Sequence, residues 1–292
     1  MLITLILNGC SKETVDTSKI NIVTSFYPMY IATANIVEGV EDVELRNLTA
    51  ATTGCLHDYQ LTTANMVTLS TADIMIINGE GMESFIDKAI KTYKDLKVIN
   101  ASEGLLENHH EEHQHEDLHN HEHGVNAHIW VSISMHIKQI ENIRDELKQL
   151  DEKNAEKYEE NANNYIRKLE EIKTEMHNVL DGIENKKIVT FHEAFDYYAE
   201  EFDLEIVSVI EREPGTYPSA RDVANIIDLV KSKEVKAIFV EPQYSRSAAD
   251  TIARETGIKV YNLDPIVTGS LEKDSYIKIM NENLDVLEEA LG

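Results

Sequence analysis

INIVTSFYPMYIATANIVEG, residues 20–39, changes from one spacing of apolar residues to another and thereby indicates the fold class of the chain. Residues 20–26 form a short apolar run that is rich in β-branched side chains, which favours a buried strand. Residues 27–39 have the pattern of a helix that ends at Gly39. A strand followed directly by a helix is the repeating unit of a parallel sheet covered by helices.

The same alternation continues over most of the chain. Further strands are expected at residues 43–50, 73–79, 97–101, 186–191, 204–210, 235–242 and 259–265. Helices are expected at residues 62–71, 82–93, 219–234, 245–257 and 275–291. Short apolar strands separated by amphipathic segments indicate βα units and a largely parallel sheet.

A helical segment from about Ser134 to Gly182 separates the two sets of strands. Its second part, for which Asp151 is a plausible N-cap, carries apolar residues at three- and four-residue steps. These residues are Tyr158, Ala162, Tyr165, Leu169, Ile172, Met176 and Val179. About 30 residues of helix span roughly 45 Å, which is long enough to run the length of a two-lobed protein.

We therefore predict an α/β protein of two lobes, each a mostly parallel sheet flanked by helices, joined by one long linking helix. The N-terminal lobe is placed at residues 19–133, the helical linker at 134–183 and the C-terminal lobe at 184–292. A length of 292 residues suits two lobes of ordinary size. The formal charge of −26, with no basic stripe, excludes nucleic acid as a partner.

The N-terminal residues 1–18 resemble the end of a truncated secretory segment followed by a tether. The apolar run at residues 2–7 is far too short to span a bilayer. It leads into LNGC, which resembles a bacterial lipobox, so Cys10 is expected to be lipidated. The alternative is an ordinary hydrophobic start. Cys55 is the one other cysteine, and with Cys10 lipidated no internal disulfide is expected.

Four potential metal ligands lie in the loops between elements, two from each lobe: His57, His128, His192 and Asp264. His57 lies in the loop after one strand, and His192 and Asp264 come directly after two others. Ligands of open α/β sheets bind outside the carboxyl ends of the strands, so these side chains are expected to converge. Three imidazoles and a carboxylate suit tetrahedral Zn²⁺.

A histidine-rich run, NHHEEHQHEDLHNHEHG at residues 108–124, has no apolar periodicity and is expected to be a disordered loop. It is interpreted as an auxiliary, weaker collector of zinc, the alternative being a solvated acidic loop with incidental affinity. Its histidines are His109, His110, His113, His115, His119, His121 and His123. Residues 115–119 match the H-E-x-x-H protease pattern, but without an apolar helix face the match is attributed to chance.

Five motifs of the chain resemble those of the metal-receptor substrate-binding proteins of ABC importers for zinc and manganese. They are HDYQLT at 57–62, AHIWVS at 127–132, FHEAFDYYAEEF at 191–202, VKAIFVEPQYS at 235–245 and NLDPI at 262–266. The resemblance covers nearly the whole chain from Lys19 and implies that His57, His128, His192 and Asp264 are the ligands. It departs from the family at Leu56 and around residues 126–133, which leaves the ligand positions intact.

The resemblance implies a lipid-anchored, extracytoplasmic, monomeric receptor that delivers Zn²⁺ to the permease of an ABC importer and catalyses no reaction. Similar proteins that bind manganese have Glu where His192 stands, and the added imidazole favours Zn²⁺ over Mn²⁺. The alternatives are a surface adhesin or zinc-sequestering protein on the same fold, and a zinc hydrolase.

Several further histidine, cysteine and acidic residues are interpreted individually. His136 and His177 are expected on the surface of the helical segment. Cys55, two residues from His57, could in principle reach the metal, but a small buried thiol is the expected role. Glu193 and Asp196 are candidates for orienting the second ring nitrogen of His192, the alternative being a solvated helix face.

The lipobox-like LNGC generates a first prediction. Cys10→Ala should move the protein from the membrane fraction to the medium or periplasm, because no acyl chain can then be attached. Cell fractionation followed by immunoblotting measures this. An unaltered distribution in the variant contradicts anchoring at Cys10.

Overall fold

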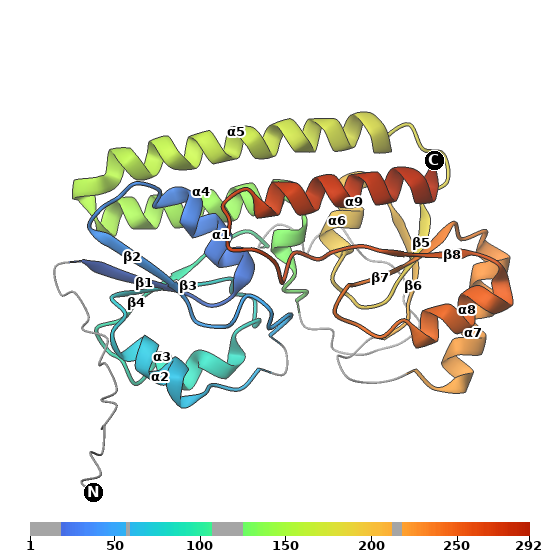
Figure 1. The fold of residues 1–292 in the computed structure, drawn as a ribbon, viewed down its shortest axis with the longest axis horizontal. Coiled ribbons are helices and arrows are strands. Elements are labelled where there is room, and N and C mark those ends of the chain that lie inside the picture. The colour runs from blue at the N-terminus through green and yellow to red at the C-terminus, as the bar shows by residue number, and fades with distance from the viewer. Residues whose placement is uncertain (1–18, 57–58, 107–124, 212–217) are drawn as a thin grey trace, which may run out of the picture.

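The computed structural model describes residues 19–56, 59–106, 125–211 and 218–292. Within them, two four-stranded parallel sheets form two lobes that lie side by side (Figure 1). The N-terminal sheet has the order β2-β1-β3-β4, with β1 Ile20–Thr24, β2 Val43–Asn47, β3 Ile74–Ile77 and β4 Lys97–Asn100. The C-terminal sheet has the equivalent order β6-β5-β7-β8, with β5 Lys187–Thr190, β6 Glu205–Val209, β7 Ala237–Val240 and β8 Lys259–Asn262. The prediction of mostly parallel sheets is confirmed.

Helices cover both sheets. The α-helices are α1 Tyr27–Ile36, α2 Thr63–Ser70, α3 Asp87–Ile90, α4 Ile133–Leu150, α5 Ala155–Leu180, α6 Asp196–Phe202, α7 Ala220–Lys233, α8 Ser247–Thr256 and α9 Ser275–Leu291. The 3₁₀ helices are η1 Ser84–Ile86, η2 Ile129–Val131 and η3 Glu152–Asn154. In the part of the chain that the structure describes, no helix combines the length and the apolar character needed to cross a membrane.

Local sequence explains where several helices begin. Pro28 stands in the first turn of α1, where its missing N–H has no helical partner to lose. A reciprocal capping box between Thr62 and Asn65 begins α2, and Ser219 and Asp222 form the same arrangement at α7. Such caps satisfy backbone donors that the first helical turn leaves unpaired.

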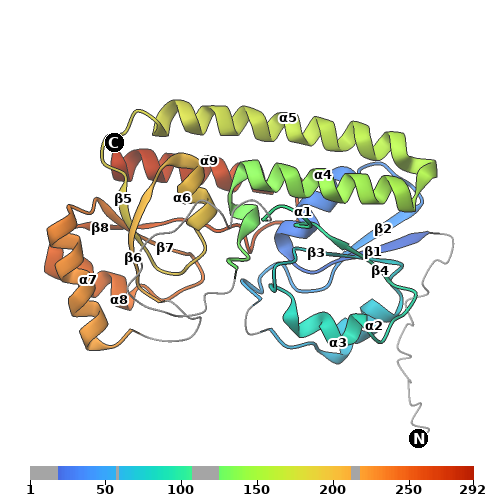
Figure 2. The same cartoon turned by 180° about the vertical axis from the view of Figure 1, so that it is seen from behind.

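The long linking helix is α5, which has 26 residues and runs over both lobes (Figures 1 and 2). It starts later than expected, because Asp151 does not cap it. Asp151 lies in a turn with φ −135° and ψ 72°, and its carboxylate accepts hydrogen bonds from Asn154 Nδ2 and Tyr158 Oη, each at 2.7 Å. The predicted helical segment is therefore two helices, α4 and α5, which pack against each other.

The helix expected at residues 82–93 is also shorter than predicted. Only residues 84–86 and 87–90 are helical. Glu83 is buried just before them, and its carboxylate accepts hydrogen bonds from the backbone N–H groups of Asn78, at 2.7 Å, and Gly79, at 3.1 Å. This side chain closes the loop after β3 instead of starting a regular helix.

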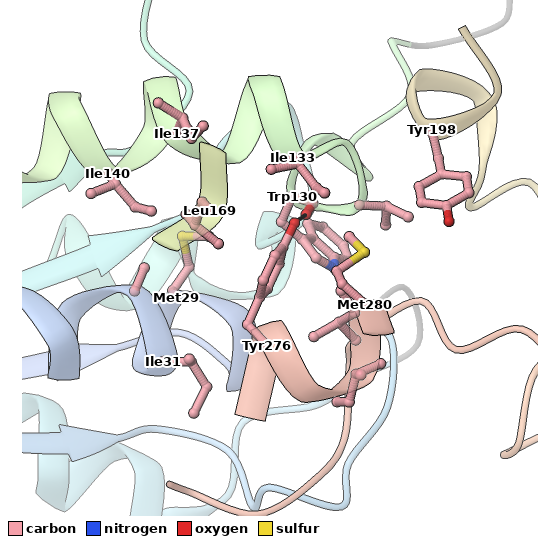
Figure 3. Packing of buried hydrophobic residues seen from close by; sticks show 14 of the residues in the cluster. Met29, Ile31, Trp130, Ile133, Ile137, Ile140, Leu169, Tyr198, Tyr276 and Met280 are labelled. Atoms are coloured by element: carbon pink, nitrogen blue, oxygen red, sulfur yellow. Dashed lines mark hydrogen bonds between the residues drawn. The ribbon is translucent and has the colours of Figure 1, made fainter. Parts of the chain in front are cut away.

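One apolar cluster extends through both lobes and includes the buried face of α5. Trp130 and Tyr276 lie in its middle (Figure 3). The Trp130 indole donates a hydrogen bond to the carbonyl of Pro265 at 2.8 Å, and Tyr276 Oη donates one to the carbonyl of Trp130 at 2.8 Å. Because Trp130 and Pro265 belong to opposite lobes, these bonds join the lobes at the centre of the molecule.

The expected surface position of His136 is wrong. Its side chain on α4 is fully buried and stacks on the Tyr276 ring, with ring centroids 4.4 Å apart. Its Nδ1 lies 3.1 Å from Gln139 Oε1. Burial lowers the pKa of His136 to about 4, because the apolar surroundings disfavour the imidazolium. His177 on α5 is partly exposed, as expected, with 37% of its side chain accessible.

Burial of His136 predicts a loss of stability in acid. The pKa of His136 is about 4 in the folded chain and about 6.5 in the unfolded chain, so the unfolded chain binds a proton more readily. The folded state therefore loses stability as the pH falls from about 6.5 towards 4. The free energy of unfolding of the wild type should therefore fall relative to His136→Phe, by up to about 1.4 kcal/mol per pH unit in this window. Urea denaturation of metal-free protein at several pH values measures the difference. His177→Phe is the control, and a pH-independent difference between wild type and His136→Phe contradicts the prediction.

Candidate metal centre

Two buried imidazoles meet where the lobes face each other. His128 directly precedes η2, and His192 follows the carboxyl end of β5. Only 3% and 2% of their respective surfaces are exposed. Their ring centroids lie 4.9 Å apart, with the rings nearly perpendicular at 82°. Imidazoles that approach edge to face in this way can direct nitrogens towards one point, and each lobe supplies one of them.

The His128 ring is oriented by Asn126. Asn126 Nδ2 donates to the carbonyl of Glu193 at 3.0 Å and to Asp196 Oδ2 at 2.7 Å, which identifies the amide nitrogen. The amide oxygen therefore faces His128, whose Nδ1 lies 2.8 Å away. Since an amide oxygen only accepts, Nδ1 carries the proton and Nε2 is the unprotonated nitrogen that could bind a metal.

The loop that carries His128 is also fixed from the other side. Asn78, the residue after β3, donates through Nδ2 to the carbonyl of Ala127 at 2.9 Å. Gln139 of α4 donates to Asn78 Oδ1 at 2.8 Å and so fixes the amide of Asn78. A ligand held in one orientation before the metal arrives loses little entropy on binding.

The orienting partner of His192 is Glu241, which sequence analysis missed. His192 Nδ1 lies 3.3 Å from Oε1 of this carboxylate, of which 1% is exposed. Burial raises the pKa of Glu241, whereas the contact with His192 lowers it. A carboxylate behind the distal nitrogen of a histidine is typical of zinc ligands. The available signal was position, because Glu241 comes directly after β7 in VKAIFVEPQYS.

Glu193 and Asp196 were expected to orient His192. In the structure, the carbonyl of Glu193 and the carboxylate of Asp196 both accept hydrogen bonds from Asn126. They thus contact the residue that orients His128, and Asp196 also interacts electrostatically with His192. Burial raises the pKa of Asp196, and the hydrogen bond from Asn126 opposes that shift.

A third donor, Cys55 Sγ, lies 3.6 Å from His128 Nε2. Cys55, His128 and His192 each offer a donor atom within 4.8 Å of the other two, a spacing that fits a single metal ion. From the sequence, a small buried thiol was the favoured role of Cys55, with contact to the metal as the alternative, and its sulfur lies beside His128. Burial, with a further contribution from Glu241, raises the pKa of the thiol.

Asp264 follows β8 at the same edge of the C-terminal sheet but is not a member of this group of three donors, as judged from the described residues. Its Oδ1 accepts a hydrogen bond from the backbone N–H of Ile266 at 2.7 Å. Burial raises the pKa of Asp264 to about 6. The remaining predicted residues, Cys10, His57 and the histidines of residues 108–124, lie outside the residues that the structure describes.

The donors fit a divalent ion of intermediate softness. Imidazole and thiol groups suit Zn²⁺ better than Mn²⁺ or Mg²⁺, which prefer oxygen. A buried cation also needs compensating negative charge, and Glu241 lies in contact with His192. The geometry supports binding of a metal ion between the lobes.

Sequence comparison with known families agrees with this chemistry. A family described as "Zinc-uptake complex component A periplasmic" matches residues 22–290. The chain belongs to this zinc-uptake family. Among curated members, the high-affinity zinc uptake system protein ZnuA of Bacillus subtilis is 33% identical over 296 residues, covering 97% of this chain and 92% of that protein. The zinc-binding lipoprotein AdcA of Streptococcus pneumoniae is 32% identical over 300 residues, covering 99% of this chain and 59% of AdcA.

Solved structures share the fold of this zinc-uptake family member. The Zn(II)-bound ZnuA-like domain of Streptococcus pneumoniae AdcA superposes with a TM-score of 0.76 at 28% identity, covering 94% of this chain and 99% of that domain. The binding protein FpvC of Pseudomonas aeruginosa in complex with Mn²⁺ gives a TM-score of 0.80 at 29% identity, covering 94% and 98%. The two-lobed α/β fold is thus confirmed.

The contact between Asn126 and His128 generates a prediction. Asn126→Ala should lower zinc affinity by about 10–100-fold, because the ring of His128 loses the acceptor that fixes its tautomer and direction. Titration against a chelator of known affinity measures the change. Asn142→Ala is a matched control, since this amide also donates to two backbone carbonyls, those of Ala101 and Glu103. Equal affinities in the two variants contradict the assigned role of Asn126.

Proposed function

We propose that this protein is an extracytoplasmic receptor that binds Zn²⁺ between its lobes and delivers it to the permease of an ABC importer. The observation that carries the proposal is the pair of buried imidazoles, His128 and His192, each with a polar side chain in contact with one ring nitrogen. Membership of the zinc-uptake family supports the same conclusion. Binding and release of an ion require no chemical step, so no enzymatic activity is proposed.

In this proposal, His128 and His192 bind the ion through Nε2. His57 and Asp264, the two other residues that the resemblance implies, are the remaining candidates for the coordination sphere. Zn²⁺ accepts nitrogen-rich tetrahedral sets without a preference from d-electrons, and imidazole disfavours Mn²⁺. The positions of the ligands on both lobes let the receptor surround its cargo and exclude water.

The histidine-rich run is proposed to act beside this site. Its seven imidazoles fall between residues 109 and 123, just before His128 in the sequence. The sequence predicts no amphipathic element there, so we expect metal binding to cost about 1–2 kcal/mol for each residue that it orders. We assign them weaker, additional zinc binding. The receptor is proposed to work as a monomer held at the membrane by lipid on Cys10.

The binding site generates a direct test of the proposed function. His192→Ala should abolish tight one-to-one zinc binding, because it removes a direct ligand and leaves Glu241 buried beside a cavity. Isothermal calorimetry on protein stripped with a chelator measures the stoichiometry and affinity. His177→Ala, which removes a partly exposed imidazole on α5, is the control. Tight zinc binding by His192→Ala contradicts the assignment of His192 as a ligand. An absence of zinc binding by the wild type contradicts the proposed function.

A further inference from the structure

A cysteine lies at the proposed zinc site. We propose that Cys55 is itself a metal ligand, and that its sulfur occupies the place in the coordination sphere that the sequence gives to Asp264. The inference rests on the proposed function, which supplies the metal. It concerns which donors this chain uses, and therefore which metals it prefers.

The spacing of the donors fits zinc coordination. A tetrahedral ion with a Zn–S bond of about 2.3 Å and a Zn–N bond of about 2.0–2.1 Å separates sulfur from nitrogen by about 3.6 Å. Cys55 Sγ lies 3.6 Å from His128 Nε2, the nitrogen that Asn126 leaves unprotonated. The donor atom of His192 lies within 4.8 Å of both. An ion can therefore enter with small movements of three side chains.

Contacts on both sides of Cys55 hold its backbone in place, so the position of the thiol follows from the fold. Leu56 is fully buried in the core that the two lobes share. Gly54 adopts a left-handed conformation with φ +82°, which turns the chain just before the cysteine. The carbonyl of Ala51 accepts a hydrogen bond from the backbone N–H of Gly269 at 3.1 Å, which ties this segment to the C-terminal half of the chain.

Asp264 has a different local role. Its Oδ1 accepts from the backbone N–H of Ile266, at 2.7 Å, inside its own turn. Ile266 has φ 59°, a strained value for a β-branched residue, so the turn needs that hydrogen bond. Among the described residues, Cys55, His128 and His192 form the donor group, and Asp264 lies outside it.

Coordination by sulfur changes the chemistry of the site in a defined way. The S–H bond breaks, a sulfur–metal bond forms, and the proton leaves to solvent. The resulting thiolate adds one negative charge beside Glu241 and so helps to neutralise the dication. Thiolate donors select Zn²⁺ strongly over Mn²⁺ and other oxygen-preferring ions. Cys55 would therefore be the specificity-determining residue of this receptor.

Cobalt substitution tests the proposal directly. Co²⁺ bound to thiolate gives a sulfur-to-cobalt charge-transfer band in the near ultraviolet, whereas Co²⁺ bound to nitrogen and oxygen alone does not. The full chain loaded with one equivalent of Co²⁺ should show this band. Cys10→Ser should keep it, because Cys55 is then the single cysteine of the chain. Asp264→Asn should also keep it.

Two substitutions that remove the Cys55 thiol complete the test. Cys55→Ala and the nearly isosteric Cys55→Ser should both lack the band. Zinc affinity should fall by more than about 100-fold, since removing an outer partner of a ligand already costs about 10–100-fold. Manganese affinity should change less, so the ratio of zinc to manganese affinity should fall in both variants. If Cys55→Ala does not fold, the serine variant and the wild-type spectrum still decide the matter.

The possible failures are distinguishable. Tight zinc and cobalt binding by the wild type without a charge-transfer band overturns Cys55 as a ligand and leaves the proposed function intact. Loss of the band in Asp264→Asn at saturating Co²⁺ overturns the exchange of Asp264 for Cys55. Failure of the wild type to bind either metal tightly overturns the proposed function together with this inference.

Discussion

Neither lobe buries the inner face of its sheet alone, because the two lobes share one apolar layer. Ile22 of β1 and Ile188 of β5 belong to the same buried cluster, which Leu169 of α5 also joins. Smaller separate clusters lie under the outer helices of each lobe. Since burial of apolar surface is the dominant favourable term in folding, the shared layer fixes how the lobes sit and where the carboxyl ends of both sheets point. The metal centre follows from that arrangement.

Most of the fold was predictable because strand and helix periods alternate along the chain. The strands of both sheets and the helices α7, α8 and α9 lie where the apolar spacing placed them. Errors arose where side chains override spacing. The carboxylate of Asp151 accepts two side-chain hydrogen bonds in a turn, and that of Glu83 closes a loop. These hydrogen bonds join groups three to seven residues apart in the sequence, and apolar periodicity does not report such polar contacts.

The error at His136 was avoidable. His136 stands three residues after Ile133 and four before Ile140, on the face of α4 that these residues bury. His136 was expected on the surface because histidine is polar, although its position in the helix indicated burial. A helix covered on more than one side accepts a neutral imidazole, here with Gln139 Oε1 beside Nδ1, although Nε2 has no hydrogen-bond partner among the described residues.

The candidate site was predicted in part, because the positions of ligands follow topology but their orientation does not. The loop before η2 and the end of β5 located His128 and His192. Asn126 and Glu241 escaped notice, since which ring nitrogen each one faces depends on side-chain rotamers. Cys55 lies two residues from His57 and so could in principle reach the metal, but a single small thiol carries no periodic signal that favours a ligand over a core residue.

Trp130 has a consequence for anyone who studies this molecule in solution. It is the one tryptophan of the chain, and its ring lies 5.3 Å from that of His128 while its indole binds the opposite lobe. Under excitation selective for tryptophan, the emission therefore originates at a single fluorophore beside His128, although the chain also has 12 tyrosines. Changes in lobe contact and changes around His128 both reach that fluorophore, so the tryptophan emission of an unlabelled sample reports on the candidate metal centre.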